Sequence, residues 1–252
     1  MALSDGVTVH VAADGPPAVK VNGDSADVAA VTNVLDRLGV TARVRCETPL
    51  PISAGFGVSG ACALGTALAV DAATAGGWTE DQLAAIAHAA EVEAGTGLGD
   101  VVGQARGGLP IRLEPGPPPR GRLDGLPARP AIEYVTFGGL DTASVIGGDT
   151  EALSAAGERA LADLREAPTV GTFMAASRRF AREADLLTDR VAAAIDDVAA
   201  AGSEAAMAML GKTVFALDGG LTDAGYDARA CRASEGAAVV EYDPRGPDPL
   251  SD

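Results

Sequence analysis

Lysine is nearly absent from this 252-residue sequence, because Lys20 and Lys212 are the only two lysines among its 19 basic residues. The chain has 35 acidic residues and a formal net charge of -16. An acidic, lysine-poor surface suits a protein whose self-repulsion is screened by salt, so we favour a salt-adapted protein. An ordinary acidic protein from a GC-rich genome is the alternative. Either surface disfavours a polyanion, so nucleic acid is not an expected partner.

Cysteine and long apolar runs are scarce as well. Cys46, Cys62 and Cys231 are widely spaced and form no CxxC pair. This pattern gives no support to a disulfide framework or a zinc site, and it suits a reducing cytosol. The sequence has no run of about 18 apolar residues and no charged-then-apolar signal at its start. We therefore expect a cytoplasmic protein without a membrane partner.

Aromatic residues make up only 4% of the chain, so Val, Leu and Ile must form most of the core. Strand patterns fall at 7–11, 18–21, 40–47, 108–113 and 131–137. Helical patterns fall at 27–38, 59–75, 79–94, 150–165, 172–185, 189–200 and 203–210. Because strands and helices do not alternate strictly, the sequence predicts an α+β fold.

Local signals set several of these boundaries. Gly39 suits a helix C-terminal cap, and Thr79 with Gln82 forms a capping-box pattern. Segment 114–130 is rich in Pro, Gly and Arg and predicts a surface loop. Segment 242–252 has three prolines and no apolar period, which predicts a frayed tail.

The most informative segment is the glycine-rich stretch Pro51-Ile-Ser-Ala-Gly-Phe-Gly-Val-Ser-Gly-Ala61. Glycines let backbone amides close around a phosphate, and the helix that follows directs its positive end at the same anion. Ser59 is placed to offer a hydroxyl to phosphate or to a phosphate-bound magnesium ion.

Other phosphate motifs fit this loop less well. The dinucleotide fingerprint GxGxxG is formally present, but Pro49 and Pro51 separate it from the strand that should precede it. A Walker loop at Gly211-Lys212-Thr213 would need its first glycine where Ala206 stands, and no VAIK-type strand follows the loop as in protein kinases. A glycine-rich turn without a ligand is the remaining alternative.

The loop resembles the proline-GLGSSAA pattern of GHMP kinases, with Val58 in place of the first serine. The resemblance implies a two-lobed GHMP fold, with a lobe like ribosomal protein S5 followed by a ferredoxin-like lobe. It also implies that ATP is bound by Pro51, Ala54, Gly55, Phe56, Gly57, Val58, Ser59, Gly60 and Ala61. Ser59 corresponds to the serine tied to Mg²⁺ in that family.

A second group of residues follows about 40 positions later. GHMP kinases carry there a glycine-bounded turn whose aspartate orients or deprotonates the acceptor hydroxyl, and an upstream glutamate that helps to hold magnesium. Asp100 and Glu91 match these two residues, and together with Ser59 they are the candidate catalytic set. Glu93 is an alternative to Glu91, and Asp100 alone could be a turn residue or a helix cap. His88 lies one helical turn before Glu91 and could contact substrate, although a lone helical histidine is usually structural.

Within the superfamily, the chain resembles archaeal pantoate kinases in four ordered motifs. They are 51–61, 91–102, 107–112 and 207–215. The resemblance implies ATP-dependent phosphorylation of pantoate with Mg²⁺, in a homodimer. Pantoate carries a carboxylate, for which Arg112 offers a bidentate partner, with a solvent-exposed strand arginine as the alternative. Thr142 is a further candidate for a hydroxyl contact.

The domain prediction has a nucleotide-binding lobe at 1–130, a C-terminal lobe at 131–241 and the tail at 242–252. Nothing before Ser4 matches the opening strand and Pro-Gly segment of GHMP kinases. Either translation starts upstream of Met1, which we favour, or the protein has lost part of its site. Two alternatives in function stay open. One is another GHMP kinase, acting on mevalonate, homoserine or shikimate, and the other is a binding protein with the same fold and no activity.

Overall fold

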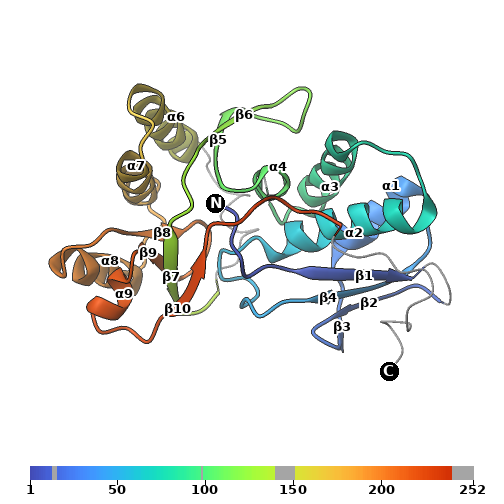
Figure 1. Ribbon diagram of the computed structural model, residues 1–252, viewed down its shortest axis with the longest axis horizontal. Helices are drawn as coiled ribbons and strands as arrows, with labels where there is room; N and C mark the ends of the chain where they lie inside the picture. Colours follow the sequence, from blue (N-terminus) through green and yellow to red (C-terminus); the bar gives the residue numbers. More distant parts are fainter. Residues whose placement is uncertain (13–15, 98, 140–150, 240–252) are drawn as a thin grey trace.

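A computed structural model of the chain describes residues 1–12, 16–97, 99–139 and 151–239. Its described strands form two four-stranded sheets and one hairpin, and helices accompany each sheet (Figure 1). The two sheets belong to two lobes that lie side by side. This arrangement confirms the predicted α+β class. Among the described residues, no helix is both long and apolar enough to cross a membrane.

The first lobe is built on a mixed sheet of order β1-β4-β2-β3, in which β4 runs antiparallel to β1 and parallel to β2. Its strands are β1 (Thr8–Ala12), β2 (Ala18–Val21), β3 (Asp24–Ser25) and β4 (Arg43–Glu47). Its helices are α1 (Ala29–Leu38), α2 (Val58–Thr74), α3 (Glu80–Ala94) and α4 (Asp100–Arg106). The first three helices pack together above the sheet in Figure 1.

Helix α2 lies at the centre of this lobe because its side chains are small. It contacts β1, α1, α3 and α4, and many of its buried residues are Ala or Gly. At Gly65 the side chain of Val9 from β1 packs so closely that a Cβ atom would collide with it. Small residues thus let four elements approach one helix. That helix begins directly at the glycine-rich loop.

The second lobe is an antiparallel sheet of order β10-β7-β9-β8. Its strands are β7 (Ala131–Thr136), β8 (Ala205–Ala208), β9 (Thr213–Leu217) and β10 (Arg229–Arg232). Its helices are α6 (Glu151–Glu166), α7 (Val170–Glu183), α8 (Asp189–Ala200) and α9 (Gly220–Asp223). Counted within the lobe, the strand order is 4-1-3-2 with helical crossovers, which is the expected ferredoxin-like arrangement.

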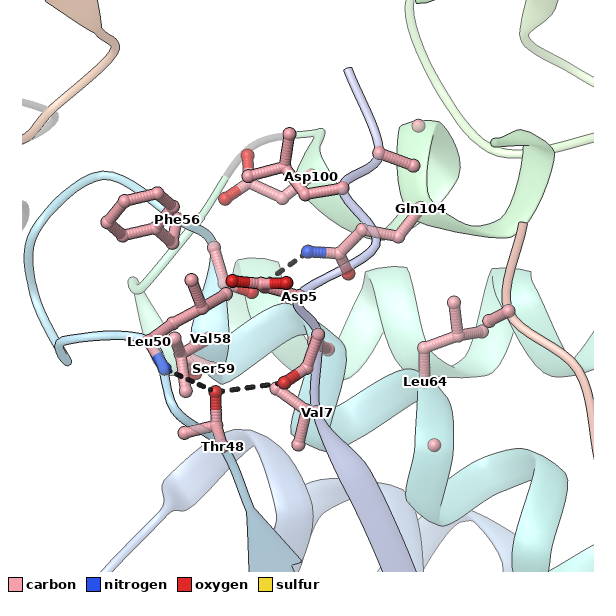
Figure 2. Close-up of a pocket in the computed structure, with 18 of the residues that line it drawn as sticks. Asp5, Val7, Thr48, Leu50, Phe56, Val58, Ser59, Leu64, Asp100 and Gln104 are labelled. Carbon is pink, nitrogen blue, oxygen red and sulfur yellow. Dashed lines mark hydrogen bonds between the residues drawn. The ribbon is translucent and has the colours of Figure 1, made fainter. Parts of the chain in front are cut away.

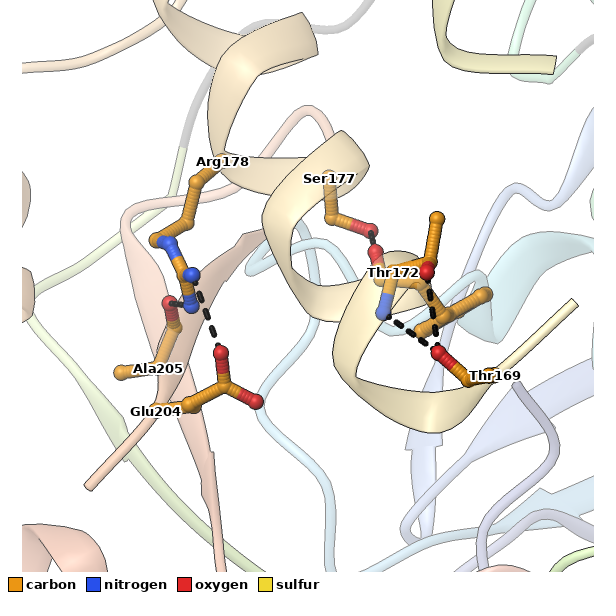
Figure 3. Close-up of polar contacts among 7 residues, drawn as sticks. Thr169, Thr172, Ser177, Arg178, Glu204 and Ala205 are labelled. Carbon is orange, nitrogen blue, oxygen red and sulfur yellow. Dashed lines mark hydrogen bonds and ion pairs between the residues drawn. The ribbon is translucent and has the colours of Figure 1, made fainter. Parts of the chain in front are cut away.

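Arg178 links helix α7 to this sheet through hydrogen bonds. Arg178 donates to the Glu204 carboxylate at 3.1 Å and to the Ala205 carbonyl at 3.3 Å (Figure 3). At the other end of the helix, the Thr169 hydroxyl accepts from the Thr172 amide at 3.0 Å. We propose that the boundary between the two lobes lies near residue 130, because β7 is the first strand of the second sheet.

The two local cap predictions agree with the structure. Gly39 ends α1 in the left-handed conformation with φ 66°. Thr79 and Gln82 form both hydrogen bonds of a capping box at the start of α3. Each depends on neighbouring residues only, which is why the sequence predicts it well.

Two element predictions are wrong. The predicted helix at 203–210 is instead strand β8 and a turn, because the short apolar segment Ala205–Ala208 pairs with β9. The predicted loop at 114–130 contains β6 (Arg122–Leu126), which pairs antiparallel with β5 (Leu109–Glu114). Pairing with a partner strand overrides the local composition in both cases. The predicted frayed tail at 242–252 lies outside the described residues.

Candidate active site

A cavity of about 1780 Å³ is lined by residues of both lobes. The first lobe contributes the glycine-rich loop and parts of α2, α3 and α4, and the second contributes parts of β7, β8 and β9. Small-molecule sites commonly enclose about 300–1,000 Å³. This cavity therefore has room for a nucleotide and a second small molecule at once.

The glycine-rich loop leads into α2 at Gly57, which has φ 63° and ψ 34°. Among the described residues, the N-cap Gly57 provides no side-chain cap to the first turn of α2, and that turn carries no acidic residue. In contrast, α3, α7 and α8 each have a threonine hydroxyl that accepts from a first-turn amide. The open amides of a helix N-terminus attract an anion through both hydrogen bonding and the helix dipole. The start of α2 is thus suited to a phosphate group.

Contacts with the second lobe help to fix the shape of this loop. Gly55 has φ 92°, and a Cβ atom there would lie 2.8 Å from the Ala208 carbonyl oxygen and 3.1 Å from the Gly211 Cα atom. Gly211 in turn packs directly on the carbonyl of Ala54. Only glycine fits at either position, because a side chain would separate the two backbones.

The other loop residues anchor the loop to the protein core. The ring of Phe56 meets the ring of Tyr134 edge-on, with a centroid distance of 4.9 Å. Val58 is buried in the core of the first lobe, and Ala61 lines the cavity. Pro51 is half-buried before the loop. Several residues of the loop, including Gly55, Phe56 and Gly57, line the cavity.

A chain of hydroxyl groups links the loop to a buried carboxylate. The Ser59 hydroxyl donates to the Thr96 hydroxyl at 3.2 Å, and Thr96 donates to Glu91 Oε1 at 2.7 Å. Glu91 is only 1% exposed, whereas Glu93 is exposed and pairs with Arg37 at 2.9 Å. The structure therefore brings Glu91, and not Glu93, to Ser59.

The oxygen atoms around Glu91 fit a magnesium ion. Glu91 Oε2 is buried and has no hydrogen-bond partner among the described residues. A Cβ atom at Gly60 would lie 2.6 Å from this oxygen, so the carboxylate packs against the first turn of α2. A carboxylate with two neighbouring hydroxyl groups is a set of hard oxygen donors, which Mg²⁺ prefers. Ser59 and Glu91 are the residues that would hold the ion.

Burial raises the pKa of Glu91 to about 7, and the nearby charge of Asp100 acts in the same direction. The hydrogen bond from Thr96 and the nearby Ser59 hydroxyl oppose this rise because they stabilise the ionised form. A carboxyl group poised near neutral pH in a cavity is typical of a functional site.

Asp100 is the first residue of α4 and lies directly against the glycine-rich loop (Figure 2). A Cβ atom at Gly57 would lie 2.8 Å from Asp100 Oδ2. Burial raises the pKa of Asp100, whereas the Met1 ammonium group, the residue's own backbone amide and Arg112 lower it. Asp100 and Glu91 both line the cavity that contains the loop. The two predicted acidic residues are therefore next to the predicted phosphate site.

The predicted substrate contacts are placed differently from one another. Arg112 of β5 lines the cavity, and its guanidinium group packs on Gly99 within electrostatic reach of Asp100. His88 is half-buried on α3 and does not belong to the residues that line the cavity. Its burial lowers its pKa, and the charge of Arg112 lowers it further. Thr142 lies outside the described residues.

Two further residues at the site were not predicted from the sequence. Thr96 links Ser59 to Glu91, and Gln104 of α4 donates to the Gly57 carbonyl at 2.9 Å. A signal for Gln104 was present, because it follows Asp100 by four residues and must share its helix face. Thr96 lies between Gly95 and Gly97, in a turn where the resemblance assigned a role only to Asp100.

Comparison with known proteins shows which families this chain resembles. Residues 20–108 match the GHMP kinases N terminal domain. The pantoate kinase of Thermococcus kodakarensis is 39% identical over 172 residues, which cover 66% of this chain and 56% of that protein. The pantoate kinase of Methanocaldococcus jannaschii is 32% identical over 173 residues, which cover 68% of this chain and 63% of that protein. The chain thus spans less than two thirds of the length of these relatives.

Solved structures with the same architecture include a phosphotransferase related to the CoA biosynthesis pathway, with a TM-score of 0.76 and 29% identity over 93% of this chain and 85% of that chain. The L. major mevalonate kinase has a TM-score of 0.66 and 16% identity over 94% of this chain and 89% of that chain, which shows a shared fold. The fold, the matched N-terminal domain and these relatives lead to one assignment. The chain is similar to GHMP kinases and, among them, to archaeal pantoate kinases.

Proposed function

We propose that this protein transfers the γ-phosphoryl group of ATP to the primary hydroxyl of pantoate, which yields 4-phosphopantoate and ADP. One observation carries the proposal: the uncapped start of α2, the buried Glu91 and Asp100 all line a single cavity. Phosphoryl transfer depends on a phosphate cradle, a metal-binding carboxylate and a carboxylate at the nucleophile. The similarity to pantoate kinases supports pantoate as the acceptor.

The start of α2 would bind the phosphate chain of ATP. Gly57 leaves the first-turn amides without a side-chain cap, so they can donate to phosphate oxygens. Ser59 and Glu91 would hold Mg²⁺, which when bound neutralises charge on the β- and γ-phosphate oxygens. The cavity walls from both lobes would exclude water from the reacting groups.

Asp100 and Arg112 would handle the acceptor. Asp100 accepts a hydrogen bond from the pantoate hydroxyl and takes its proton as the new oxygen–phosphorus bond forms and ADP departs. The raised pKa of Asp100 makes it a stronger base than an exposed aspartate. Arg112, within reach of Asp100, can form a bidentate pair with the pantoate carboxylate. The carboxylate would then orient the hydroxyl toward the phosphate site.

The test compares phosphoryl transfer to pantoate, mevalonate, homoserine and shikimate, with ATP and magnesium in molar salt. We expect pantoate to be the preferred acceptor by kcat/KM. Asp100→Asn should reduce turnover by about 10²-fold or more while leaving ATP affinity within a few-fold. The matched control is Asp36→Asn on the exposed surface of α1, which should leave turnover unchanged.

Preference for another of these acceptors would replace pantoate but keep the kinase chemistry. Unchanged turnover in Asp100→Asn would remove Asp100 from the mechanism. ATP binding without transfer to any acceptor would favour a binding protein. The homodimer, the cytoplasmic location and the adaptation to salt stay predictions of the sequence.

A further inference from the structure

Gln104 joins the two halves of the candidate site through its side chain. It lies one helical turn after Asp100 on α4, and its Nε2 donates to the Gly57 carbonyl at 2.9 Å (Figure 2). The two residues are 47 positions apart in the sequence. Gln104 thus connects the helix that carries Asp100 to the residue where the phosphate-binding helix begins.

The amide orientation follows from this bond. A carbonyl oxygen can only accept, so the nitrogen of the Gln104 amide must face Gly57. The same carbonyl also accepts from the Ala61 amide at 3.0 Å, which is the first helical bond of α2. Gln104 therefore holds the N-terminal cap of α2 from outside the helix.

The two oxygen atoms of Gln104 differ in their surroundings. Its backbone carbonyl accepts from the Ala237 amide at 3.0 Å. Its Oε1 is buried and has no hydrogen-bond partner among the described residues. A buried oxygen without a partner reduces stability, which is a common feature of functional sites.

Gln104 and Asp100 lie over the same small spot on the loop. A Cβ atom at Gly57 would lie 2.9 Å from Gln104 Nε2 and 2.8 Å from Asp100 Oδ2. The absence of a side chain at Gly57 lets α4 approach the loop this closely. The spacing between Asp100 and the start of α2 is thus set by the contact that Gln104 makes.

We propose that Gln104 is a positioning residue that fixes the distance between the phosphate group and the acceptor hydroxyl. The inference rests on the proposed kinase function, because Asp100 binds the acceptor and the amides of α2 bind phosphate. Gln104 itself touches neither reacting group. A displacement of about 1 Å between reacting groups reduces the rate by about 10²-fold.

The test uses Gln104→Met, which keeps the length of the side chain and removes the donor. We expect kcat to fall by about 10–100-fold, while the KM and Kd for ATP stay within about threefold of the parent. The matched control is Gln82→Met, which removes the capping-box bond at Thr79 and should leave kcat unchanged.

A second measurement does not depend on the acceptor. Hydrogen exchange of the Ala61 amide, which donates to the same Gly57 carbonyl, should be several-fold faster in Gln104→Met than in the parent, because one hydrogen bond to the helix cap is lost. Exchange in α7 and α8 should not change. If the parent fails to phosphorylate pantoate, the proposed function is wrong, and this measurement still decides whether Gln104 holds the loop.

Two outcomes would overturn the inference. One is a kcat within twofold of the parent in Gln104→Met, and the other is unchanged exchange of the Ala61 amide. A loss of ATP affinity equal to the loss of kcat would also overturn it, since that result indicates general damage to the nucleotide site.

Discussion

Replacing Glu91 with glutamine should make the stability of the metal-free protein less dependent on pH. Folding raises the pKa of this carboxyl from 4.5 to about 7. Between these two values the folded state holds a proton that the unfolded chain releases. The stabilisation from Glu91 is therefore complete below pH 4.5 and is lost as the pH rises through 7. Glutamine is neutral throughout this range and loses nothing.

The magnitude follows from the pKa difference. At about 1.4 kcal/mol per pKa unit, ionisation of Glu91 lowers the free energy of unfolding by about 2.5 kcal/mol between pH 5 and pH 8. The glutamine amide would still accept from Thr96, but its nitrogen would replace the buried Oε2, which has no described partner. That substitution costs about 1–3 kcal/mol at every pH. The pH-dependent part is free of this cost, so it is the quantity to measure.

The assay is thermal or urea unfolding of parent and Glu91→Gln at pH 5 and pH 8, with a chelator and constant molar salt. The free energy of unfolding of the variant, taken relative to the parent, should be about 2.5 kcal/mol higher at pH 8 than at pH 5. This difference corresponds to about 5–10 °C in Tm. Glu93→Gln removes the same formal charge from the exposed side chain paired with Arg37. This control should change stability by less than about 1 kcal/mol. A shift below about 0.5 kcal/mol in Glu91→Gln would refute the reasoning.

Two further substitutions test the geometry of the site. Gly57→Ala should lower turnover by at least about 10²-fold, because its methyl group would displace Asp100 and Gln104. Gly39→Ala has a similar positive φ and open space around it, so in unfolding and rate assays it should lose stability of about 1–2 kcal/mol and no activity. Arg112→Met should reduce kcat/KM for the acceptor by about 10²-fold without a change in the KM for ATP, and an unchanged acceptor KM would argue against a carboxylate contact.

The sequence predicted the parts of the fold that depend on neighbouring residues. The cap at Gly39 and the capping box at Thr79 are set within one helical turn, and both appear in the structure. Strand β8 was mistaken for a helix because Ala205–Ala208 is short and apolar in either state. Its state is decided by pairing with β9, which follows it across a turn. Such pairing energy is not visible in a local pattern.

In the candidate site, too, local motifs were predicted and contacts between distant segments were not. The glycine spacing predicted the phosphate loop, the resemblance to GHMP kinases implied Glu91 and Asp100 beside it, and the structure brings all three to one cavity. His88 shares a helix face with Glu91, yet it lies beside Arg112 and does not line that cavity. The bond between Gln104 and Gly57 spans 47 positions and emerges only when α4 packs against the loop.

The backbone contact of Gly55 and Ala54 with Gly211 has a consequence for how the protein unfolds. Each lobe presents bare main chain to the other at the place where the nucleotide is proposed to bind, so neither lobe can unfold without releasing its neighbour's loop. The two lobes should therefore unfold in one cooperative transition, and ATP should raise the Tm of that whole transition. Halves divided near residue 130 and mixed in solution should regain nucleotide affinity only when they reassociate.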